Sequence, residues 1–282
     1  MSSTLSYTIT SSQNKFVKYL KNNIPFQIMP TQRTPLNYLR FPEITDSFKN
    51  QILLHTGYDV RPFSQDILSS TSYQHILLKS YILSAQRLGL NTNSNNTSFS
   101  QLLIHGPDSE ESAKYLKTTL PILKEYSTTS NINICIEMPA FSKSIWNVVP
   151  YESNFEFIEE YFRTVIEYNL PIVIDTAHLH SNGLNVEQMI TLLKEFEDNY
   201  TFIHLNGNSR DMFKKDKHTT FTELSGFENN KIKNADNLLT YVSKIDKICI
   251  SEQKCNNLDY FNKLGKTYGF NIINDIPSNL II

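Results

Sequence analysis

The sequence predicts an α/β protein of the (β/α)8 TIM barrel class. Eight short apolar segments, each suited to a buried strand, alternate with segments of helical periodicity. No repeat or linker divides them, and a chain of 282 residues suits one large domain, so we expect a single barrel domain over residues 1–282. The expected strands are residues 5–9, 25–29, 51–55, 102–105, 132–137, 172–175, 201–205 and 247–252.

Helical patterns fill the intervals between these strands. Segment 72–88 is the longest, and Gly89 is a suitable C-terminal stop for it. Asn185 can cap a helix that continues to about residue 197. Pro121 should bend or split the helix that starts near residue 110, because proline has no amide hydrogen to donate. The other expected helices are residues 13–22, 43–49, 153–168, 235–244 and 257–267.

An open, doubly wound sheet is the competing topology, and the strand and helix pattern alone leaves it open. A glycine-rich phosphate loop after the first strand would favour it. The chain has only 8 glycines and no GxGxxG motif, so the barrel remains the better prediction.

Composition and charge restrict the class of protein. The net charge of −2 gives no general basic field for nucleic acid, so binding of that kind needs a local patch or bound cations. No apolar run is long enough to span a membrane, and residues 1–6 lack the basic and apolar regions of a signal peptide. Three cysteines without paired spacing indicate a reducing, intracellular compartment, the cytoplasm or the nucleus.

Residue types that bind metals stand at the ends of six consecutive predicted strands. Because the carboxyl ends of barrel strands face one rim, these side chains should gather there. Asp216 and His218 lie in the polar loop before the last strand and can join them. The strand-end residues are His55, His105, Glu137, Asp175 with His178 just beyond it, His204 and Glu252.

Each of these residues alone has an ordinary structural interpretation, such as a hydrogen-bonded histidine or a helix cap. Together they do not, because four carboxylates facing one another would repel strongly. Divalent cations remove that conflict, and imidazole and carboxylate donors without cysteine suit zinc, manganese or iron. Nine ligands suit two or three ions, and three divalent ions against four carboxylates leave a positive site that attracts phosphate.

Four short motifs resemble the endonuclease IV family of apurinic/apyrimidinic endonucleases, and most closely its divergent viral members. The resemblance extends from about Gln32 to Lys254. The motifs are Ile136-Glu137, the stretch from Ile174-Asp-Thr-Ala-His178 to Gly183, His204-Leu-Asn206, and Asp216-Lys-His218.

The resemblance implies a TIM barrel that holds three Zn²⁺ ions, with Mn²⁺ an option in part of the site. It assigns His55, His105 and Glu137 to one ion. It assigns Glu137, Asp175, His204 and Glu252 to a second ion, and His178, Asp216 and His218 to a third.

The implied reaction is hydrolysis of the phosphodiester 5′ of an abasic site in double-stranded DNA, in base excision repair. Glu137 and Glu252 are the expected catalytic residues, which would position the attacking hydroxide. Arg33 and Tyr58 are candidates for filling the gap in the DNA, and Lys217 for contact with its backbone. We expect a monomer, in the cytoplasm, the nucleus, a viral replication site or a virion.

Two alternatives remain beside the nuclease. Glu137, Asp175, His204 and Glu252 alone would make the one-metal site of a sugar isomerase or epimerase on the same fold. The other five ligands have no role in such a site. The second alternative is a damaged-DNA-binding protein that keeps the barrel without turnover.

Overall fold

The computed structural model describes residues 3–10, 26–29, 52–57, 59–87, 90, 101–222, 228–252 and 258–272. The chain divides into two compact units that interleave along the sequence. The first comprises residues 1–7, 139–161 and 173–282, and the second comprises residues 8–138 and 162–172. The boundaries fall inside one helix and two strands, so neither unit is a simple half of the chain.

The predicted barrel class is confirmed by the sheet. Its nine strands follow the order β10-β7-β6-β5-β4-β3-β2-β1-β11, and a further parallel pairing of β10 with β1 closes it. All eight predicted strands are present. They are β1 (Thr4–Thr10), β2 (Phe26–Met29), β3 (Ile52–His55), β4 (Gln101–His105), β5 (Ile134–Glu137), β6 (Ile172–Asp175), β7 (Phe202–His204) and β10 (Ile248–Ser251).

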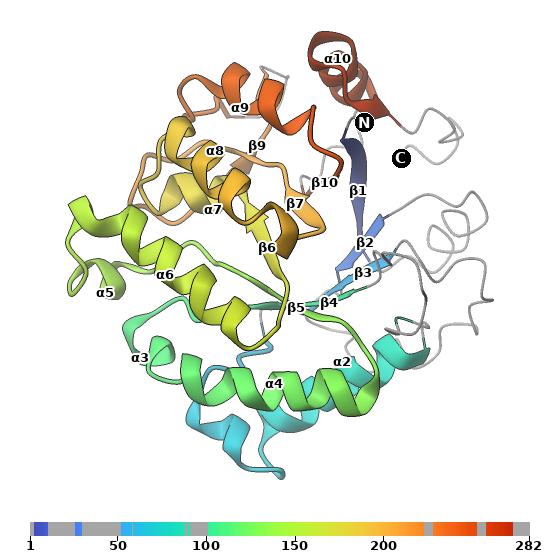
Figure 1. Cartoon of the computed structure of the whole chain (residues 1–282), viewed down its shortest axis with the longest axis vertical. Coiled ribbons are helices and arrows are strands. Elements are labelled where there is room, and N and C mark those ends of the chain that lie inside the picture. Colours follow the sequence, from blue (N-terminus) through green and yellow to red (C-terminus); the bar gives the residue numbers. More distant parts are fainter. Residues whose placement is uncertain are drawn as a thin grey trace. The chain divides into compact units, whose positions relative to one another are not determined.

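The second unit carries β2 to β5 in parallel register. Strands β3 (Ile-Leu-Leu-His) and β5 (Ile-Cys-Ile-Glu) are buried along their whole length. Continuous apolar runs of this kind are typical of parallel strands that are covered on both faces. The 3-10 helix η3 (Gln65–Leu68) leads into α2 (Tyr73–Arg87). Helices α2 and α4 (Leu116–Ser130) pack against each other and against β4 and β5 (Figure 1).

The expected break at Pro121 is wrong in its position. The chain breaks earlier, between the short helix α3 (Glu110–Ala113) and α4, and α4 runs through Pro121. Pro121 cannot donate to the carbonyl of Lys117 one turn before it. That carbonyl instead accepts from the hydroxyl of Tyr168 at 3.5 Å, which lowers the cost of a proline in the helix.

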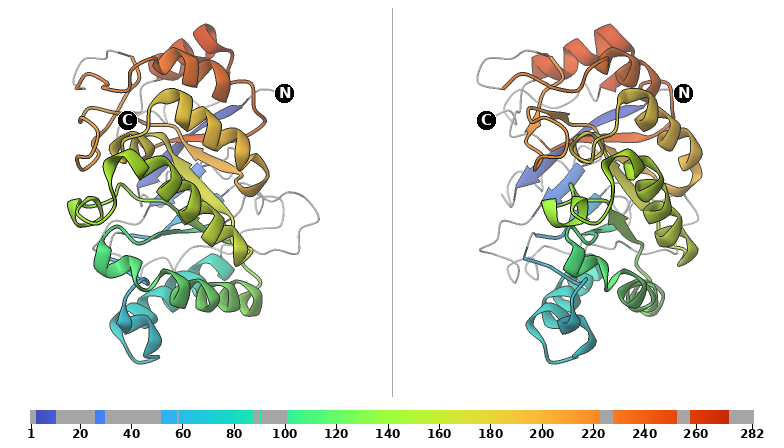
Figure 2. Two further views of the ribbon diagram at one scale, coloured as in Figure 1. Left: turned by 60° about the vertical axis from the view of Figure 1, so that its left-hand side comes forward. Right: turned by 90° about the vertical axis from the view of Figure 1, so that its left-hand side faces the viewer.

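The first unit carries β6, β7, β10 and most of β1. Asn185 caps α8 (Val186–Glu195) as predicted, in a reciprocal pair of hydrogen bonds with Gln188. Helix α8 packs against α9 (Ala235–Val242), as Figures 1 and 2 show. The remaining helices that lie in or extend into this unit are α5 (Lys143–Trp146), η4 (Tyr151–Ser153), α6 (Asn154–Glu167), α7 (Thr176–Ser181), η5 (Glu197–Asn199) and α10 (Leu258–Tyr268).

Three short strands were not predicted. Strand β11 (Asn271–Ile272) extends the sheet beside β1. Strands β8 (Gly207–Asn208) and β9 (His218–Thr219) form a separate antiparallel pair, in which Asn208 lies opposite His218. This pair closes the base of a loop over residues 209–217, which carries one predicted ligand.

Two predicted elements lie outside the described residues, namely the helices at 13–22 and 43–49. Cys135 and Cys249 are buried free thiols. Within the described part of the chain, no helix combines the length and apolarity that a membrane crossing requires.

Candidate metal centre

Three predicted ligands of the second unit converge at the ends of neighbouring strands. In the register of β4 and β5, His105 lies beside Glu137, and β3 places His55 next to them. Their donor atoms lie within 4.8 Å of one another. Glu137 Oε2 is 3.5 Å from His55 Nε2 and 3.4 Å from His105 Nε2. Glu137 and His55 are almost fully buried, so this is a carboxylate enclosed with two imidazoles.

The ring of His55 is held in one orientation. Its Nδ1 lies 2.6 Å from the carbonyl oxygen of Thr56, which can only accept, so Nδ1 carries the hydrogen. That leaves Nε2, which faces Glu137, with the lone pair. A histidine whose second nitrogen donates to a backbone carbonyl is the usual arrangement of a metal ligand.

In the first unit, the two oxygens of Asp175 have separate roles. Oδ1 caps α7 by accepting the amide hydrogens of Ala177 and His178 at 2.6 and 3.0 Å. Oδ2 accepts from the side-chain amide of Asn206 at 2.7 Å. The same Oδ2 faces His204 Nδ1 at 3.8 Å and His218 Nε2 at 3.6 Å. The carboxylate therefore fixes the start of α7 and also offers an oxygen to the site.

Glu252, just after β10, completes this side of the site. Its Oε2 lies 3.5 Å from His204 Nδ1 and 3.6 Å from His218 Nδ1. Donor atoms of Asp175, His204 and Glu252 all lie within 4.8 Å of one another.

The third predicted set, His178, Asp216 and His218, is also brought together. Asp216 Oδ2 is 3.8 Å from His178 Nε2 and 3.1 Å from His218 Nε2. His178 comes from α7, whereas Asp216 and His218 come from the loop before β9 and from β9 itself. The donor oxygen of Asp175 also lies within 4.8 Å of donor nitrogens of His178 and His218.

The spacing of these atoms fits ligands that share a cation. Two donors bound to one tetrahedral zinc at about 2.0–2.2 Å lie about 3.3–3.6 Å apart. Hydrogen bonds between nitrogen and oxygen are shorter, at about 2.7–3.2 Å. Five of the eight imidazole–carboxylate distances given above lie between 3.4 and 3.6 Å and two are 3.8 Å, and only the 3.1 Å contact of His218 with Asp216 has hydrogen-bond length. The donor set thus fits divalent cations.

The electrostatics of the first unit also demand positive charge. Burial disfavours the charged form of His218, but Asp175, Asp216 and Glu252 outweigh burial and raise the pKa of His218 to about 10. Burial tends to raise the pKa of Asp216, yet the hydrogen bond from His218 and the charge of His178 hold that pKa well below its usual range. These carboxylates therefore favour positive charge at this position, such as a proton on His218.

The other two described histidines outside this set have ordinary structural roles. His75 places Nδ1 3.1 Å from the carbonyl of Ile67 and Nε2 2.8 Å from the hydroxyl of Tyr126. His180 places Nδ1 3.2 Å from the side-chain nitrogen of Asn208. Both have neutral partners at hydrogen-bond distance, in contrast to the histidines that face carboxylates.

Asn206 ends the His204-Leu-Asn206 motif, but no role in the site was predicted for it. It is fully buried, and its side chain contacts both Asp175 and Glu252, at 2.7 and 3.4 Å. Its side-chain oxygen also accepts the amide hydrogen of Glu252 at 3.0 Å. Its place two residues after His204, just beyond the end of β7, was the available signal.

The loop over residues 209–217 is fixed at its base and at its tip. At the base, the side-chain oxygen of Asn208 accepts the amide hydrogens of Arg210 and Lys217 at 3.0 and 3.1 Å. At the tip, Phe213 has a left-handed φ of 59° and donates its amide hydrogen to Ser181 at 2.7 Å. Its ring lies 4.3 Å from the ring of Tyr151. The loop therefore presents Asp216 from a defined backbone.

Gly183 leaves the space that Phe213 fills. Its φ is +88°, and a Cβ there would lie 2.1 Å from the Phe213 ring. We expect Gly183→Ala to lower the free energy of unfolding by at least about 2 kcal/mol, because backbone strain and displacement of the ring add. Gly269→Ala is the matched control, since Gly269 has a φ of +84° and open space around it. It should cost only about 1 kcal/mol, measured by urea unfolding. If both variants lose the same free energy of unfolding, the Phe213 ring moves aside without an energetic cost.

The predicted DNA-contact residues fall in two groups. Arg33 and Tyr58 lie outside the described residues. Lys217 is exposed, and its ammonium group forms an ion pair with Glu228. Its contact with DNA stays a prediction.

Solved structures with the same fold carry names of sugar isomerases and epimerases. A D-tagatose 3-epimerase-like protein matches with a TM-score of 0.61 and 17% identity, covering 94% of this chain and 95% of its own. An IolI protein with a bound zinc atom matches with a TM-score of 0.57 and 14% identity over 95% of both chains. A xylose isomerase domain protein from Planctomyces limnophilus matches at 0.56 and 12%, over 95% and 98%.

At these identities the likeness shows the fold, a TIM barrel. No protein-family model matches the chain, and neither does any curated protein sequence. A shared fold alone assigns neither a nuclease nor a sugar isomerase activity. The choice between the two therefore depends on the residues of the site.

Proposed function

We propose that this chain is a multinuclear metal-dependent phosphodiester hydrolase that cuts DNA on the 5′ side of abasic sites. The observation that carries the proposal is the convergence of His178, Asp216 and His218 beside Asp175. A one-metal sugar site needs only four ligands and gives these three residues no role. The nine-ligand resemblance to endonuclease IV supports the same choice.

The proposed ligand sets follow the sequence prediction. His55, His105 and Glu137 would hold one ion, and His178, Asp216 and His218 another. Asp175, His204 and Glu252 would hold the remaining ion, with Glu137 as a shared ligand. When bound, such ions supply positive charge for phosphate oxygens and lower the pKa of a water molecule.

The residues themselves have separable tasks. Glu137 and Glu252 would accept hydrogen bonds from the attacking water or hydroxide and hold that oxygen in line with the phosphorus atom. His55 fixes the lone pair that faces Glu137, through its bond to Thr56. Asn206 would hold the carboxylates of Asp175 and Glu252 in fixed positions through its two side-chain contacts.

Abasic DNA is the proposed substrate because its damaged nucleotide leaves the helix at low cost. One base's stacking and pairing are already missing, so rotation of the sugar into a buried site is easier there than at intact DNA. Arg33 and Tyr58 remain the proposed residues that occupy the gap. Base excision repair follows from that substrate.

A sugar isomerase or epimerase is the second candidate. It is favoured by the names of the neighbouring structures and by the subset Glu137, Asp175, His204 and Glu252. It predicts one tightly bound ion for each chain, whereas the hydrolase predicts three. A damaged-DNA-binding protein without turnover is a third reading, which the complete ligand set argues against.

The test is incision of a duplex with one abasic site, beside an undamaged duplex, by zinc-loaded protein whose metal content is counted. We expect a single cut 5′ of the lesion, a 3′-hydroxyl product, and about three ions for each chain. Tight binding to the abasic duplex without incision would support the binding protein. One ion with neither binding nor incision would discard both DNA functions and direct the search to sugar substrates.

A further inference from the structure

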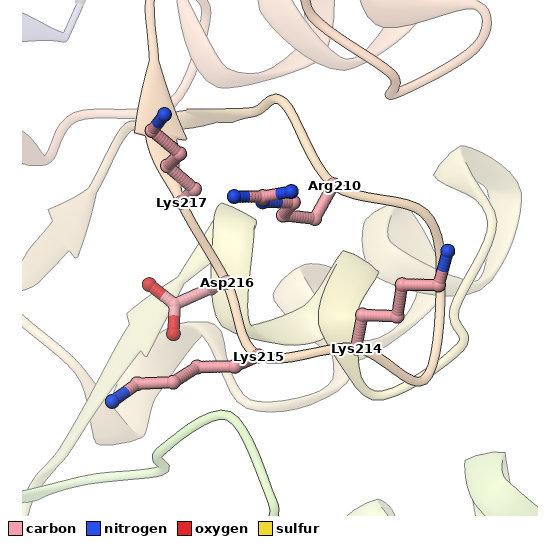
Figure 3. A pocket seen from close by; sticks show the side chains of 5 residues that line it. All are labelled: Arg210, Lys214, Lys215, Asp216 and Lys217. Atoms are coloured by element: carbon pink, nitrogen blue, oxygen red, sulfur yellow. The ribbon is translucent and has the colours of Figure 1, made fainter.

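The loop over residues 209–217 is rich in basic side chains. It carries Arg210, Lys214, Lys215 and Lys217 against only two acidic residues, Asp211 and Asp216. These four cations and Asp216 line a pocket of about 320 Å³, shown in Figure 3. Asp216 also faces His178 and His218, so the pocket lies directly beside the candidate metal centre of the first unit.

The four cations differ in whether a protein carboxylate neutralises them. Lys214 forms an ion pair with Asp211 at 2.9 Å, and Lys217 forms one with Glu228. Within the described part of the chain, the side chains of Arg210 and Lys215 form no ion pair or hydrogen bond, although Arg210 is near enough to Glu228 to help lower its pKa. In Figure 3 the Arg210 guanidinium extends across the loop toward the segment of Asp216 and Lys217.

The backbone that carries these two cations is already ordered. Asn208 holds the amide of Arg210, and the amide of Ser209 donates to the carbonyl of Lys217 at 3.0 Å. The packing of Phe213 fixes the tip between them. An anion that binds here orders two side chains and no backbone, so little conformational entropy opposes binding.

We propose that Arg210 and Lys215 form a subsite for a phosphate group that is bound but not cleaved, next to the metal centre at Asp216. A guanidinium matches two phosphate oxygens at once, and an ammonium group adds a point charge from another side. The identity of this phosphate as part of a DNA backbone rests on the proposed function. The subsite itself also suits the phosphate of a small molecule.

The test compares the double variant Arg210→Ala/Lys215→Ala with Lys244→Ala in zinc-loaded protein. Lys244 is exposed and precedes β10, at the other end of that strand from Glu252, and its removal also lowers the net charge. Binding to a duplex that contains an abasic analogue with a methylphosphonate on its 5′ side is measured from 50 to 300 mM salt, by fluorescence anisotropy. The slope of log K against log salt is negative, and its magnitude falls by about 1 for each phosphate that the protein no longer contacts.

Because the subsite holds one phosphate, we expect the magnitude of the slope to fall by about 1 in the double variant and to remain unchanged in Lys244→Ala. An unchanged slope in the double variant overturns the proposal. A second arm measures broadening of the ³¹P signal of inorganic phosphate. If the wild-type protein binds no DNA, the proposed function fails, and the subsite stands only if broadening is weaker in the double variant than in the wild type. Equal broadening then overturns the subsite as well.

Discussion

Replacement of Glu137 by glutamine is expected to lower kcat/KM for incision of abasic DNA by at least about 10³-fold, or about 4 kcal/mol of transition-state stabilisation. Glutamine has the size of glutamate but carries no negative charge. In the structure, one oxygen of Glu137 faces His55 and His105 from a fully buried position. Loss of that charge removes a ligand from the first set and, if Glu137 is shared, from the second set too.

A stability measurement separates this role from a purely structural one. Metal-free Glu137→Gln should unfold at the same temperature as the metal-free wild type or higher, because a buried charge has been removed. The gain in unfolding temperature on adding zinc should shrink, since ligand-induced stabilisation follows affinity. Glu125→Gln on the exposed side of α4 is the control and should keep both activity and the zinc-induced gain. A large drop in the metal-free unfolding temperature would contradict the metal assignment and indicate a packing role.

The strand-end residues of the candidate metal centre could be predicted, because their positions follow from the local sequence pattern. His55, His105 and Glu137 each close a run of apolar residues, so the end of the strand and the site residue are one signal. Parallel strands then bring those ends to one side without any knowledge of packing. The same reasoning found Asp175, which the sequence allowed to be a helix cap or a ligand. The structure gives it both contacts, because a carboxylate has two oxygens.

Contacts between distant parts of the chain were not predictable from the pattern. Asn206 contacts Glu252 across 46 positions, and the Lys117 carbonyl finds the Tyr168 hydroxyl across 51 positions. Each depends on the folded arrangement of other elements. The rule that proline breaks a helix failed for the same reason, since it counts the lost hydrogen bond but not its replacement.

Which of the loop cations form ion pairs with protein carboxylates could also be learned only from the structure. The sequence offered Lys217 as a contact for the DNA backbone because it lies in a lysine-rich loop with Lys214 and Lys215. Its pairing with Glu228, 11 positions away in sequence, depends on how the chain returns after β9. Arg210 carried no motif, and only the pocket distinguishes it from any other exposed arginine.

Replacement of His178 by alanine is expected to reduce the metal content from about three ions to two for each chain, and incision by at least about 10²-fold. His178 Nε2 faces Asp216 and is the only member of the third set that comes from α7. Without it, Asp216 and His218 remain as two ligands, too few for a closed zinc site. A sugar isomerase with one ion would keep both its metal and its activity, because that ion needs none of these three residues.

His180→Ala is the matched control for this prediction. His180 lies two residues further along the same helix and is buried to a similar degree, but it faces the amide of Asn208 instead of a carboxylate. Both variants remove a buried side chain from α7, so each is purified as folded monodisperse protein before its metal is counted by mass spectrometry. We expect three ions in His180→Ala and two in His178→Ala. Equal metal content in both variants would mean that His178, Asp216 and His218 hold no ion, and the multinuclear hydrolase would lose the observation on which it rests.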